Sequence, residues 1–387
     1  SGSVDIFIEK ENEIREGDII SVRCIRNDDK IYGKEIKILT KSILNPVKDK
    51  NSLFFKFNNA KIDMLKILKN RTLFLNKTKE FFYKNDFLEI ETPTLVESPG
   101  VEDHLEPFKT KYFDYNGKSK TFYLPTSPEF SLKEALTSGI EKVFEIAKVF
   151  RNYGENSILH KPEFLMLEWY RAYSNYEVIM DDILNLLKFL SESLYKKNVL
   201  IYKNRECRLD SIKKIKVKDL FAEYSINLDN YSLNEESFKK EITNFLKIDN
   251  NSLSKEDMFF KFFLNFIEPK LGFENPVIVY EYPYEMAKLS ELCDNSCYGK
   301  RFELYLFGIE IANGYQELTD YKRQKENFLK TITNRKLNRA KEKLTLPKRF
   351  LNSLKYGLPP SSGVALGVER LFMIFENLED IHYTSLF

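Results

Sequence analysis

Long apolar segments are missing from this chain of 387 residues, which contains no run of about 18 apolar residues. We therefore expect no membrane span. The first residues, Ser1-Gly2-Ser3, also lack the basic and apolar stretches of a signal peptide and are more typical of a cloning remnant. With 43% hydrophobic and 30% charged residues, the composition is that of a soluble globular protein.

Cysteine is scarce as well, with only Cys24, Cys207, Cys293 and Cys297. Four scattered cysteines are too few for a disulfide framework. Cys293 and Cys297 resemble half of a metal site, but no second pair of cysteine or histidine residues follows nearby. We expect free thiols, which are typical of a reducing cytoplasm.

The chain also lacks an excess of positive or negative charge. The net charge is +2, and lysine and arginine are interspersed among aspartate and glutamate. The sequence therefore has no broad basic surface for nucleic acid. The chain length predicts two or more structural units, since domains usually have about 100–200 residues.

Residues 1–46 alternate polar and apolar positions in short runs, with Gly17 and the Asn27-Asp28-Asp29 cluster between them. This pattern predicts a small β unit. Two interpretations stay open: a partial oligonucleotide-binding barrel, or a β appendage packed on the main domain. Asn45-Pro46 ends the unit, and we interpret residues 47–59 as a linker.

Residues 60–387 have the pattern of a larger α+β domain. Apolar residues at helical spacing predict a helix over residues 60–84, and a proline-ended strand follows at residues 87–93. A proline lacks the backbone N–H, which restricts such a strand to an edge, an end or an interface. A helix and strand of this kind could pair with their own copies in a homodimer.

Thr126-Ser127-Pro128-Glu129 is typical of a helix start, with a capping residue and a proline near the first turn. Glu129 would lie at the helix N-terminus, where it either complements the helix dipole or binds a ligand amine in a cleft.

Further along, we interpret residues 174–300 as a helical insertion with a short β portion around residues 277–280.

The stretch from Phe150 to Arg171 predicts a strand, a polar loop and a second strand. Arg151 stands at the end of the first strand and Phe164 on the second. An arginine fork binds phosphate oxygens and an aromatic face stacks on a base, so this hairpin predicts a nucleotide site. The alternative is a surface hairpin with ordinary ion pairs.

Residues 301–318 predict a second hairpin, which contains two carboxylates that the ladder can bring together, Glu303 and Glu310. Strict alternation places Glu310, Ala312 and Gly314 on one face. Two carboxylates on a mostly apolar sheet repel unless a cation lies between them, and Mg²⁺ prefers oxygen ligands. The small residues suggest that a ligand approaches the backbone closely. Solvated acids on an exposed face are the alternative.

Residues 361–373 predict a glycine-containing strand that enters an apolar helix. Gly363 and Gly367 remove side chains where a ligand could lie, and Arg370 begins the helix and points back toward it. Packing of the strand is the alternative reason for the glycines.

Together, these stretches resemble the three signature motifs of the class II aminoacyl-tRNA synthetases, in the order and spacing of the lysyl, aspartyl and asparaginyl subgroup. Residues 87–93 resemble the dimer-interface motif, residues 150–168 the second motif and residues 363–370 the third. The resemblance covers roughly residues 60–387. It implies a class II catalytic domain, an antiparallel β-sheet flanked by helices, with the small N-terminal β unit added to it.

Finer features resemble the lysine-handling members, and among them the elongation factor P lysine ligases, the EpmA (PoxA/GenX) family. These features are at residues 126–129, 310–318, 167–171 and 362–370 and in the short ending at Phe387. That family attaches lysine, preferentially the β isomer, to a lysine of translation elongation factor P. Its members lack the anticodon-binding barrel, so the β unit is a departure: it is either a remnant of a barrel or the end of a full one.

For ATP, the resemblance implies that Arg151 binds the α-phosphate. His160, Phe164 and Arg370 would hold the adenine and the outer phosphates of a bent ATP. The same resemblance assigns Mg²⁺ to Glu303 and Glu310, and further ATP contacts to Asn152, Glu155 and Gly367.

For the amino acid, the resemblance implies that Glu129 binds one amine of lysine and Glu317 the other, while Asn313 holds the carboxylate. Ala312 lies where α- and β-lysine would be distinguished. Further residues implied for this pocket are Ser127, Glu168, Tyr170 and Gly363.

The implied function is ATP-dependent activation of lysine or β-lysine and its transfer to elongation factor P by a cytoplasmic homodimer. A lysyl-tRNA synthetase that charges tRNA(Lys) is the runner-up, and a non-catalytic synthetase-like regulator is a third interpretation. Two departures bear on the choice. The loop after Arg151 has one extra residue, so its acid is assigned to Glu155, and Leu159 replaces an arginine common in tRNA-charging enzymes.

Overall fold

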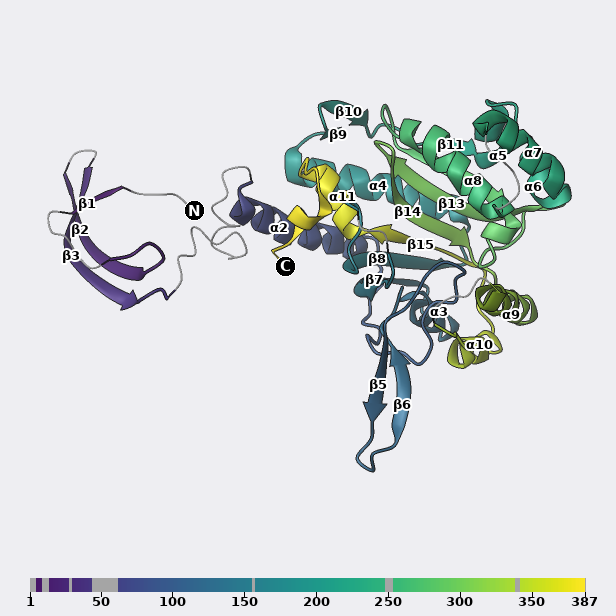
Figure 1. The fold of residues 1–387 in the computed structure, drawn as a ribbon, viewed down its shortest axis with the longest axis horizontal. Helices are drawn as coiled ribbons and strands as arrows, with labels where there is room; N and C mark the ends of the chain where they lie inside the picture. The colour runs from purple at the N-terminus through teal and green to yellow at the C-terminus, as the bar shows by residue number, and fades with distance from the viewer. Residues whose placement is uncertain are drawn as a thin grey trace. The chain divides into compact units, whose positions relative to one another are not determined.

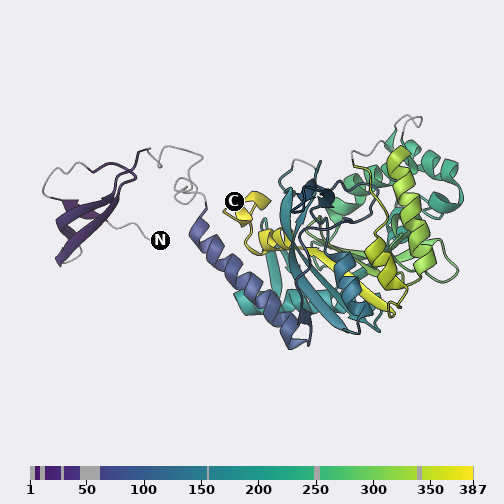
Figure 2. The same cartoon turned by 90° about the horizontal axis from the view of Figure 1, so that it is seen from below.

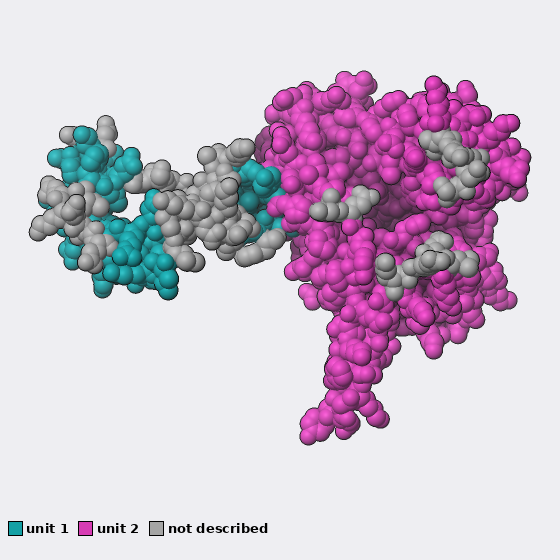
Figure 3. Space-filling model, in the orientation of Figure 1, with its two compact units in different colours: residues 1–73, 383–387 teal, residues 74–382 magenta. Residues whose placement is uncertain are grey.

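The computed structural model describes residues 5–8, 14–27, 30–43, 62–154, 157–247, 253–337 and 342–386 (Figure 1). The chain divides into two compact units, which Figure 3 colours separately. The first consists of residues 1–73 and 383–387, and the second of residues 74–382. None of the helices in the described ranges is long and apolar enough to cross a membrane.

A three-stranded sheet forms the β part of the first unit. Its strands are β1 (Ile6–Ile8), β2 (Ile19–Asn27) and β3 (Lys30–Thr40), in the order β1-β3-β2. β2 and β3 form an antiparallel hairpin, and β1 joins β3 in parallel. The described part of this unit thus contains three strands, where a complete oligonucleotide-binding barrel has about five.

An eight-stranded sheet is the centre of the second unit (Figure 1), in the order β11-β12-β13-β14-β15-β8-β7-β4. Its neighbours are antiparallel except at the two edges, where β11 pairs with β12 and β4 with β7 in parallel. The strands are β4 (Leu88–Glu89), β7 (Lys142–Phe150), β8 (Glu163–Ala172), β11 (Lys213–Lys216), β12 (Val277–Pro283), β13 (Tyr298–Leu306), β14 (Ile309–Gln316) and β15 (Ser361–Gly367). This sheet and its helices confirm the predicted α+β class.

Two small hairpins and a set of helices complete the unit. The hairpins are β5 (Lys109–Phe113) with β6 (Ser119–Tyr123), which projects from the sheet in Figure 1, and β9 (Val199–Tyr202) with β10 (Arg205–Arg208). The helices are α2 (Met64–Lys84), α3 (Glu129–Thr137), α4 (Tyr176–Tyr195), α5 (Val217–Ala222), α6 (Asn230–Leu233), α7 (Glu235–Leu246), α8 (Lys255–Phe262), α9 (Tyr321–Leu337), α10 (Lys348–Leu354) and α11 (Val368–Phe375). Short turns are the π-helix η1 (Phe263–Ile267) and the 3₁₀-helices η2 (Glu268–Lys270), η3 (Tyr284–Met286) and η4 (Ile381–Thr384).

Local sequence signals mark the starts of two helices, and the first of them was predicted. α3 starts at Glu129 with Pro128 as its N-cap residue. α8 begins with a capping box, in which Ser254 and Asp257 satisfy each other's backbone N–H groups. The β portion expected around residues 277–280 is β12, which is an inner strand of the central sheet. That part of the expected helical insertion therefore belongs to the sheet.

Aromatic side chains join residues 74–84 of α2, which belong to the second unit, to one face of the sheet (Figure 2). Phe82 stacks on Phe144 of β7 with ring centroids 4.6 Å apart and lies 5.2 Å from Trp169 of β8. Phe144 and Trp169 are cross-strand partners and therefore share a face. This face is filled by packing, which leaves the opposite face for a site.

Loss of the Phe82 ring should cost about 3–5 kcal/mol of unfolding free energy, because the ring is fully buried and its removal leaves a cavity. Urea denaturation of Phe82→Ala against the parent chain measures this difference. Tyr115, at the exposed β5–β6 turn, is the matched control, and Tyr115→Ala should change stability by less than about 0.5 kcal/mol. Similar losses in both variants would contradict the assigned core.

Candidate active site

One row of side chains crosses five strands of the central sheet. Cross-strand pairing aligns Glu303 of β13, Asn313 of β14, Ala365 of β15, Glu168 of β8 and Glu145 of β7. Successive residues of a strand point to opposite faces, so Glu168 and its row lie on the face opposite Trp169. The sheet thus gathers polar side chains on the face that the aromatic core leaves open.

A β-bulge in β14 changes which of its residues reach this face. Ala312 pairs with Leu304, but Glu310 pairs with the very next residue, so β14 has one extra residue between them. Strict alternation, which placed Glu310 and Ala312 on one face, is wrong at this point. Glu310 and Asn313 share the face of Glu303, and the side chain of Ala312 lies on the other.

Two glycines of the predicted site make room for side chains of the chain itself. A Cβ at Gly314 would lie 2.3 Å from Cζ of Phe302, and a Cβ at Gly363 would lie 2.1 Å from Cδ1 of Tyr170. The expectation that a ligand approaches the backbone at these positions is therefore wrong, because aromatic rings occupy the space. At Gly367, a Cβ would meet only atoms of Arg370, at 3.7 Å or more.

A cavity of about 800 Å³ opens on the polar face of the sheet. Nine residues that the sequence singled out line it: Arg151, Asn152, His160, Phe164, Glu303, Glu310, Asn313, Gly367 and Arg370. Ala312 also borders it, although its side chain lies on the other face of the sheet. Glu155 lies outside the described residues. The other predicted residues, Ser127, Glu129, Glu168, Tyr170, Gly363 and Glu317, do not line this cavity and form a buried polar cluster of their own, Gly363 through its contact with Tyr170.

One end of the cavity combines cations with an apolar floor. The guanidinium of Arg151 lies 5.3 Å from the ring centroid of Phe164, and within the described chain its buried Nε has no hydrogen-bond partner. Arg370 donates to the carbonyl oxygen of Glu310 at 2.8 Å and contacts Nε2 of His160 at 2.8 Å. The floor is a small apolar cluster of Ala147, Val149, Met166, Phe164 and Ala365. This arrangement suits a flat ring with attached anionic groups.

The buried cluster centres on Lys133 of α3, whose ammonium forms ion pairs with both Glu129 and Glu317. Burial alone would lower the pKa of Lys133, but the charges of the two carboxylates raise it above its usual value. Burial raises the pKa of Glu317 to about 7, although Lys133 opposes this. Within the described residues, Glu317 Oε1 and Asn313 Oδ1 are buried without a hydrogen-bond partner.

Glu168 is the third carboxylate of the cluster and is fully buried. It accepts hydrogen bonds from the hydroxyl of Ser127 at 2.6 Å and from that of Tyr170 at 2.9 Å. Burial and the neighbouring charge of Glu129 nevertheless raise the pKa of Glu168 to about 8. Three acids therefore surround one buried ammonium, and the cluster can accept additional positive charge.

Both carboxylates of the predicted metal site, Glu303 and Glu310, line the cavity. Glu303 pairs with Arg301 and accepts hydrogen bonds from the hydroxyls of Tyr282, at 2.6 Å, and Tyr305. Burial and the charge of Glu303 raise the pKa of Glu310. The two carboxylates are thus close enough to repel, which the sequence predicted.

Sequence reasoning missed Lys133 and Arg301. Lys133 stands four residues after Glu129 in α3, a spacing that is usual for exposed ion pairs, so it carried no sign of burial. Arg301 stands two residues before Glu303 in the same strand, so both side chains lie on one face. Strand alternation was therefore sufficient to predict Arg301 as a site residue.

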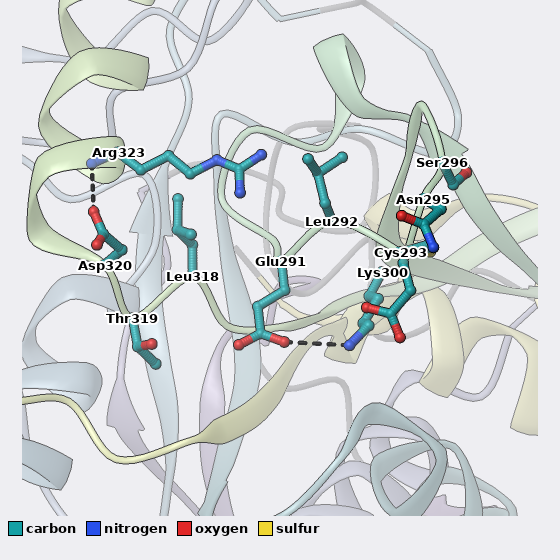
Figure 4. Close-up of a pocket in the computed structure, with 11 residues that line it drawn as sticks. Glu291, Leu292, Cys293, Asn295, Ser296, Lys300, Leu318, Thr319, Asp320 and Arg323 are labelled. Atoms are coloured by element: carbon teal, nitrogen blue, oxygen red, sulfur yellow. Dashed lines mark hydrogen bonds and ion pairs between the residues drawn. The ribbon is translucent and has the colours of Figure 1, made fainter.

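A second cavity, of about 610 Å³, lies beside the ends of β13 and β14 (Figure 4). Its lining includes Glu291, which pairs with Lys300 at 3.3 Å, and Arg323, whose backbone N–H donates to Asp320. None of the residues that the sequence singled out for catalysis or binding lines it. The predicted ATP and metal residues line the first cavity instead.

The central sheet is mostly antiparallel and contains a hairpin with an arginine and an aromatic residue. Its strand β15 enters α11 through Gly367 and Arg370. This is the catalytic architecture of a class II synthetase. A model of the family "tRNA synthetases class II (D, K and N)" matches residues 54–387, and the chain belongs to this family. Its relatives are named ligases, and it is an enzyme of the ligase class.

Two kinds of relative are similar over most of the chain. The lysine–tRNA ligase of Buchnera aphidicola (subsp. Schizaphis graminum) is 34% identical over 96% of this chain and 76% of its own length. The elongation factor P–(R)-β-lysine ligase of Avibacterium paragallinarum is 32% identical over 84% of this chain and 95% of its own length. The corresponding ligase of Hamiltonella defensa is 31% identical over 83% and 94%.

The raised pKa of Glu168 predicts a pH dependence of stability. Between the ordinary value of 4.5 and about 8, the folded chain holds a proton on Glu168 that the unfolded chain has lost. Stability therefore falls with rising pH in this window, by up to about 1.4 kcal/mol per unit. In Glu168→Gln, which resembles the neutral acid, the free energy of unfolding measured from pH 5 to 8 should fall less steeply. Parallel pH curves for the two proteins would contradict the assignment.

Proposed function

We propose that this ligase activates lysine or β-lysine with ATP and transfers the lysyl group to a lysine side chain of translation elongation factor P. The observation that carries the amino-acid assignment is the excess of buried carboxylates. Glu129, Glu168 and Glu317 surround the single ammonium of Lys133, so the pocket favours a ligand that brings further ammonium groups. Among amino acids, lysine and β-lysine bring two.

ATP is the proposed partner of the cationic end. Arg151 would hold the α-phosphate with its buried Nε as a donor, since no group in the described residues accepts a hydrogen bond from it. His160, Phe164 and Arg370 would hold the adenine and the outer phosphates, and Asn152 and Gly367 complete the lining. Asn152 already donates its backbone N–H to Glu106 at 2.8 Å, so its contribution is to shape the loop.

Mg²⁺ fits the residues Glu303 and Glu310. Both supply carboxylate oxygens, and their mutual repulsion, which helps raise the pKa of Glu310, would be relieved by a cation. The described residues contain no group of three or more histidine, cysteine, aspartate or glutamate ligands. Such a two-carboxylate site is typical of Mg²⁺ that takes its other ligands from phosphates and water. When bound, the ion would neutralise the charge that develops on the phosphate oxygens.

The chemistry follows from positioning and electrostatics. Glu129 and Glu317 would bind the two amines of lysine, and Asn313 would hold its carboxylate near the α-phosphate. That carboxylate is already ionised and attacks the α-phosphorus in line, while Arg151 and Arg370 stabilise the departing pyrophosphate and the transition state. The product is the lysyl-adenylate, whose carbonyl carbon then accepts the second nucleophile.

A protein acceptor is favoured by the residue pattern Leu167–Arg171 and by Leu159, which replaces an arginine common in tRNA-charging enzymes. The elongation factor P ligases also match this chain over nearly their whole length. Lysine–tRNA ligases at 34% identity support tRNA(Lys) as the competing acceptor. In either case the enzyme would act in the cytoplasm.

We further propose a homodimer through β4 and α2, where Leu88 and Tyr83 are exposed.

The direct test incubates the protein with ATP, Mg²⁺ and labelled lysine or β-lysine, together with elongation factor P or tRNA(Lys). Label on elongation factor P, with little on tRNA, is the expected result. Label on tRNA alone would favour the competing function. Absence of lysine-dependent pyrophosphate exchange would instead indicate a non-catalytic binding protein.

Glu317→Gln should raise the KM for lysine in pyrophosphate exchange by about 100-fold or more, because it leaves a buried ammonium without its counter-charge. The KM for ATP should change by less than about threefold. Glu163→Gln is the control, since Glu163 is exposed and pairs with Lys148. An equal loss of affinity for both substrates would indicate misfolding and contradict the assigned role.

A further inference from the structure

The loop of residues 101–106 forms one wall of the cavity, and the rest of the chain fixes it in place. The guanidinium of Arg335 in α9 is buried beneath it. It donates to the carbonyl oxygens of Glu102, Asp103 and Leu105 at 2.7–3.2 Å. It also pairs with the carboxylate of Glu106 at 2.9 Å. The backbone of this loop therefore has a defined position.

Two further side chains of the loop are held by neighbouring elements. Asp103 pairs with Lys288 at 2.6 Å. His104 pairs with Glu256 of α8 at 3.0 Å, and this hydrogen bond raises the pKa of His104. Both side chains are thus engaged in holding the loop against the helical side of the cavity.

Glu102 is different from these residues. It lines the cavity and is only partly exposed, and none of the described residues donates a hydrogen bond to its carboxylate. Its backbone is fixed by Arg335, so the carboxylate is presented by a rigid loop. Gly100 leaves space beside it, since a Cβ there would lie 3.5 Å from Glu102 Oε1 and only 2.6 Å from Thr126 Oγ1.

The charges around Glu102 locate it relative to the proposed reaction. Burial raises its pKa, the charges of Arg151 and Arg301 oppose this, and that of Glu129 adds to it. His104 contributes a smaller opposing charge. In the proposed function, Arg151 holds the α-phosphate and Glu129 an amine of the lysine. With both substrates held in this way, the carbonyl carbon of the lysyl-adenylate would lie between those two groups.

Other carboxylates that line the described part of the cavity have partners. Glu303 is held by Arg301, Glu310 pairs with Arg370 at 3.7 Å, and Glu369 accepts from the backbone N–H of Leu165 at 2.9 Å. Glu268, which also lines the cavity, is engaged by another group of the chain. Glu102 is therefore the carboxylate best able to receive a proton from a group that enters the cavity.

We propose that Glu102 is the general base of the transfer step, which rests on the proposed function of the site. The acceptor lysine enters as an ammonium and gives one proton to the Glu102 carboxylate. Its nitrogen lone pair attacks the carbonyl carbon of the lysyl-adenylate and forms the amide C–N bond. The bond from that carbon to the phosphate oxygen breaks, and AMP leaves with the electron pair. The second proton of the nitrogen leaves to solvent, and Glu102 later releases its own.

Glu102→Gln should slow the transfer of the lysyl group but not the activation of lysine. Lysine-dependent pyrophosphate exchange should stay within about threefold of the parent enzyme, because activation needs no base. Single-turnover transfer from enzyme-bound adenylate to elongation factor P at pH 7.5 should fall about 100-fold or more, the usual contribution of a positioned base. Glu97→Gln, at an exposed residue paired with Lys120, is the control and should leave both reactions unchanged.

Two additional readouts identify a base. Hydroxylamine, which is unprotonated at pH 7.5, should form lysine hydroxamate at the same rate on both enzymes. The transfer rate of Glu102→Gln relative to the parent enzyme should rise from pH 7 to pH 10. A lysine amine has a pKa of about 10.4, so a larger fraction of the acceptor is already unprotonated at pH 10 and needs no base. Glu102→Asp should recover part of the transfer rate.

Three results would overturn the inference. Transfer by Glu102→Gln within threefold of the parent enzyme would show that the carboxylate is not needed. An equal loss of exchange, hydroxamate formation and transfer would assign it to substrate binding or to loop structure. A parent enzyme that activates lysine but labels tRNA and not elongation factor P would overturn the proposed function, and this inference with it.

Discussion

A buried ammonium, that of Lys133, joins α3 to the end of β14 through the carboxylates of Glu129 and Glu317. A buried ion pair of this kind contributes little net stability, yet removal of one partner is costly, so its role is to fix geometry. The third carboxylate, Glu168, leaves the cluster with more acid than base. Burial raises the pKa values of Glu168 and Glu317, and the neighbouring charge of Glu129 adds to both shifts.

The division of the sheet into two faces explains how this cluster can exist. Phe82, Phe144 and Trp169 supply the apolar packing on one face, and polar side chains take the alternate positions on the other. The loop that Arg335 holds, and the aromatic residues Phe259 and Phe260 of α8, then line the cavity from outside the sheet. The polar groups are expensive to bury, and the aromatic face offsets that cost.

Local patterns in the sequence predicted the helix start at Glu129 and a nucleotide hairpin with Arg151 and Phe164. The resemblance to the class II synthetases implied the α+β domain and added His160 and Arg370, which line the same cavity. These features depend on short-range spacing and on motifs that keep their order. The bulge in β14 was not predictable, because one extra residue in a ladder leaves no mark on an alternating apolar stretch. The packing roles of Gly314 and Gly363, and the burial of Lys133, depend on residues far away in sequence.

The acidic cluster holds protons until a ligand brings positive charge. Calorimetric titration of lysine at pH 7.0, in buffers of different ionisation enthalpy, measures the number of protons exchanged on binding. Because burial keeps Glu168 and Glu317 partly protonated, arrival of two ammonium groups should release protons, close to one per lysine. Lysine binding with no proton release, or with proton uptake, would contradict this account.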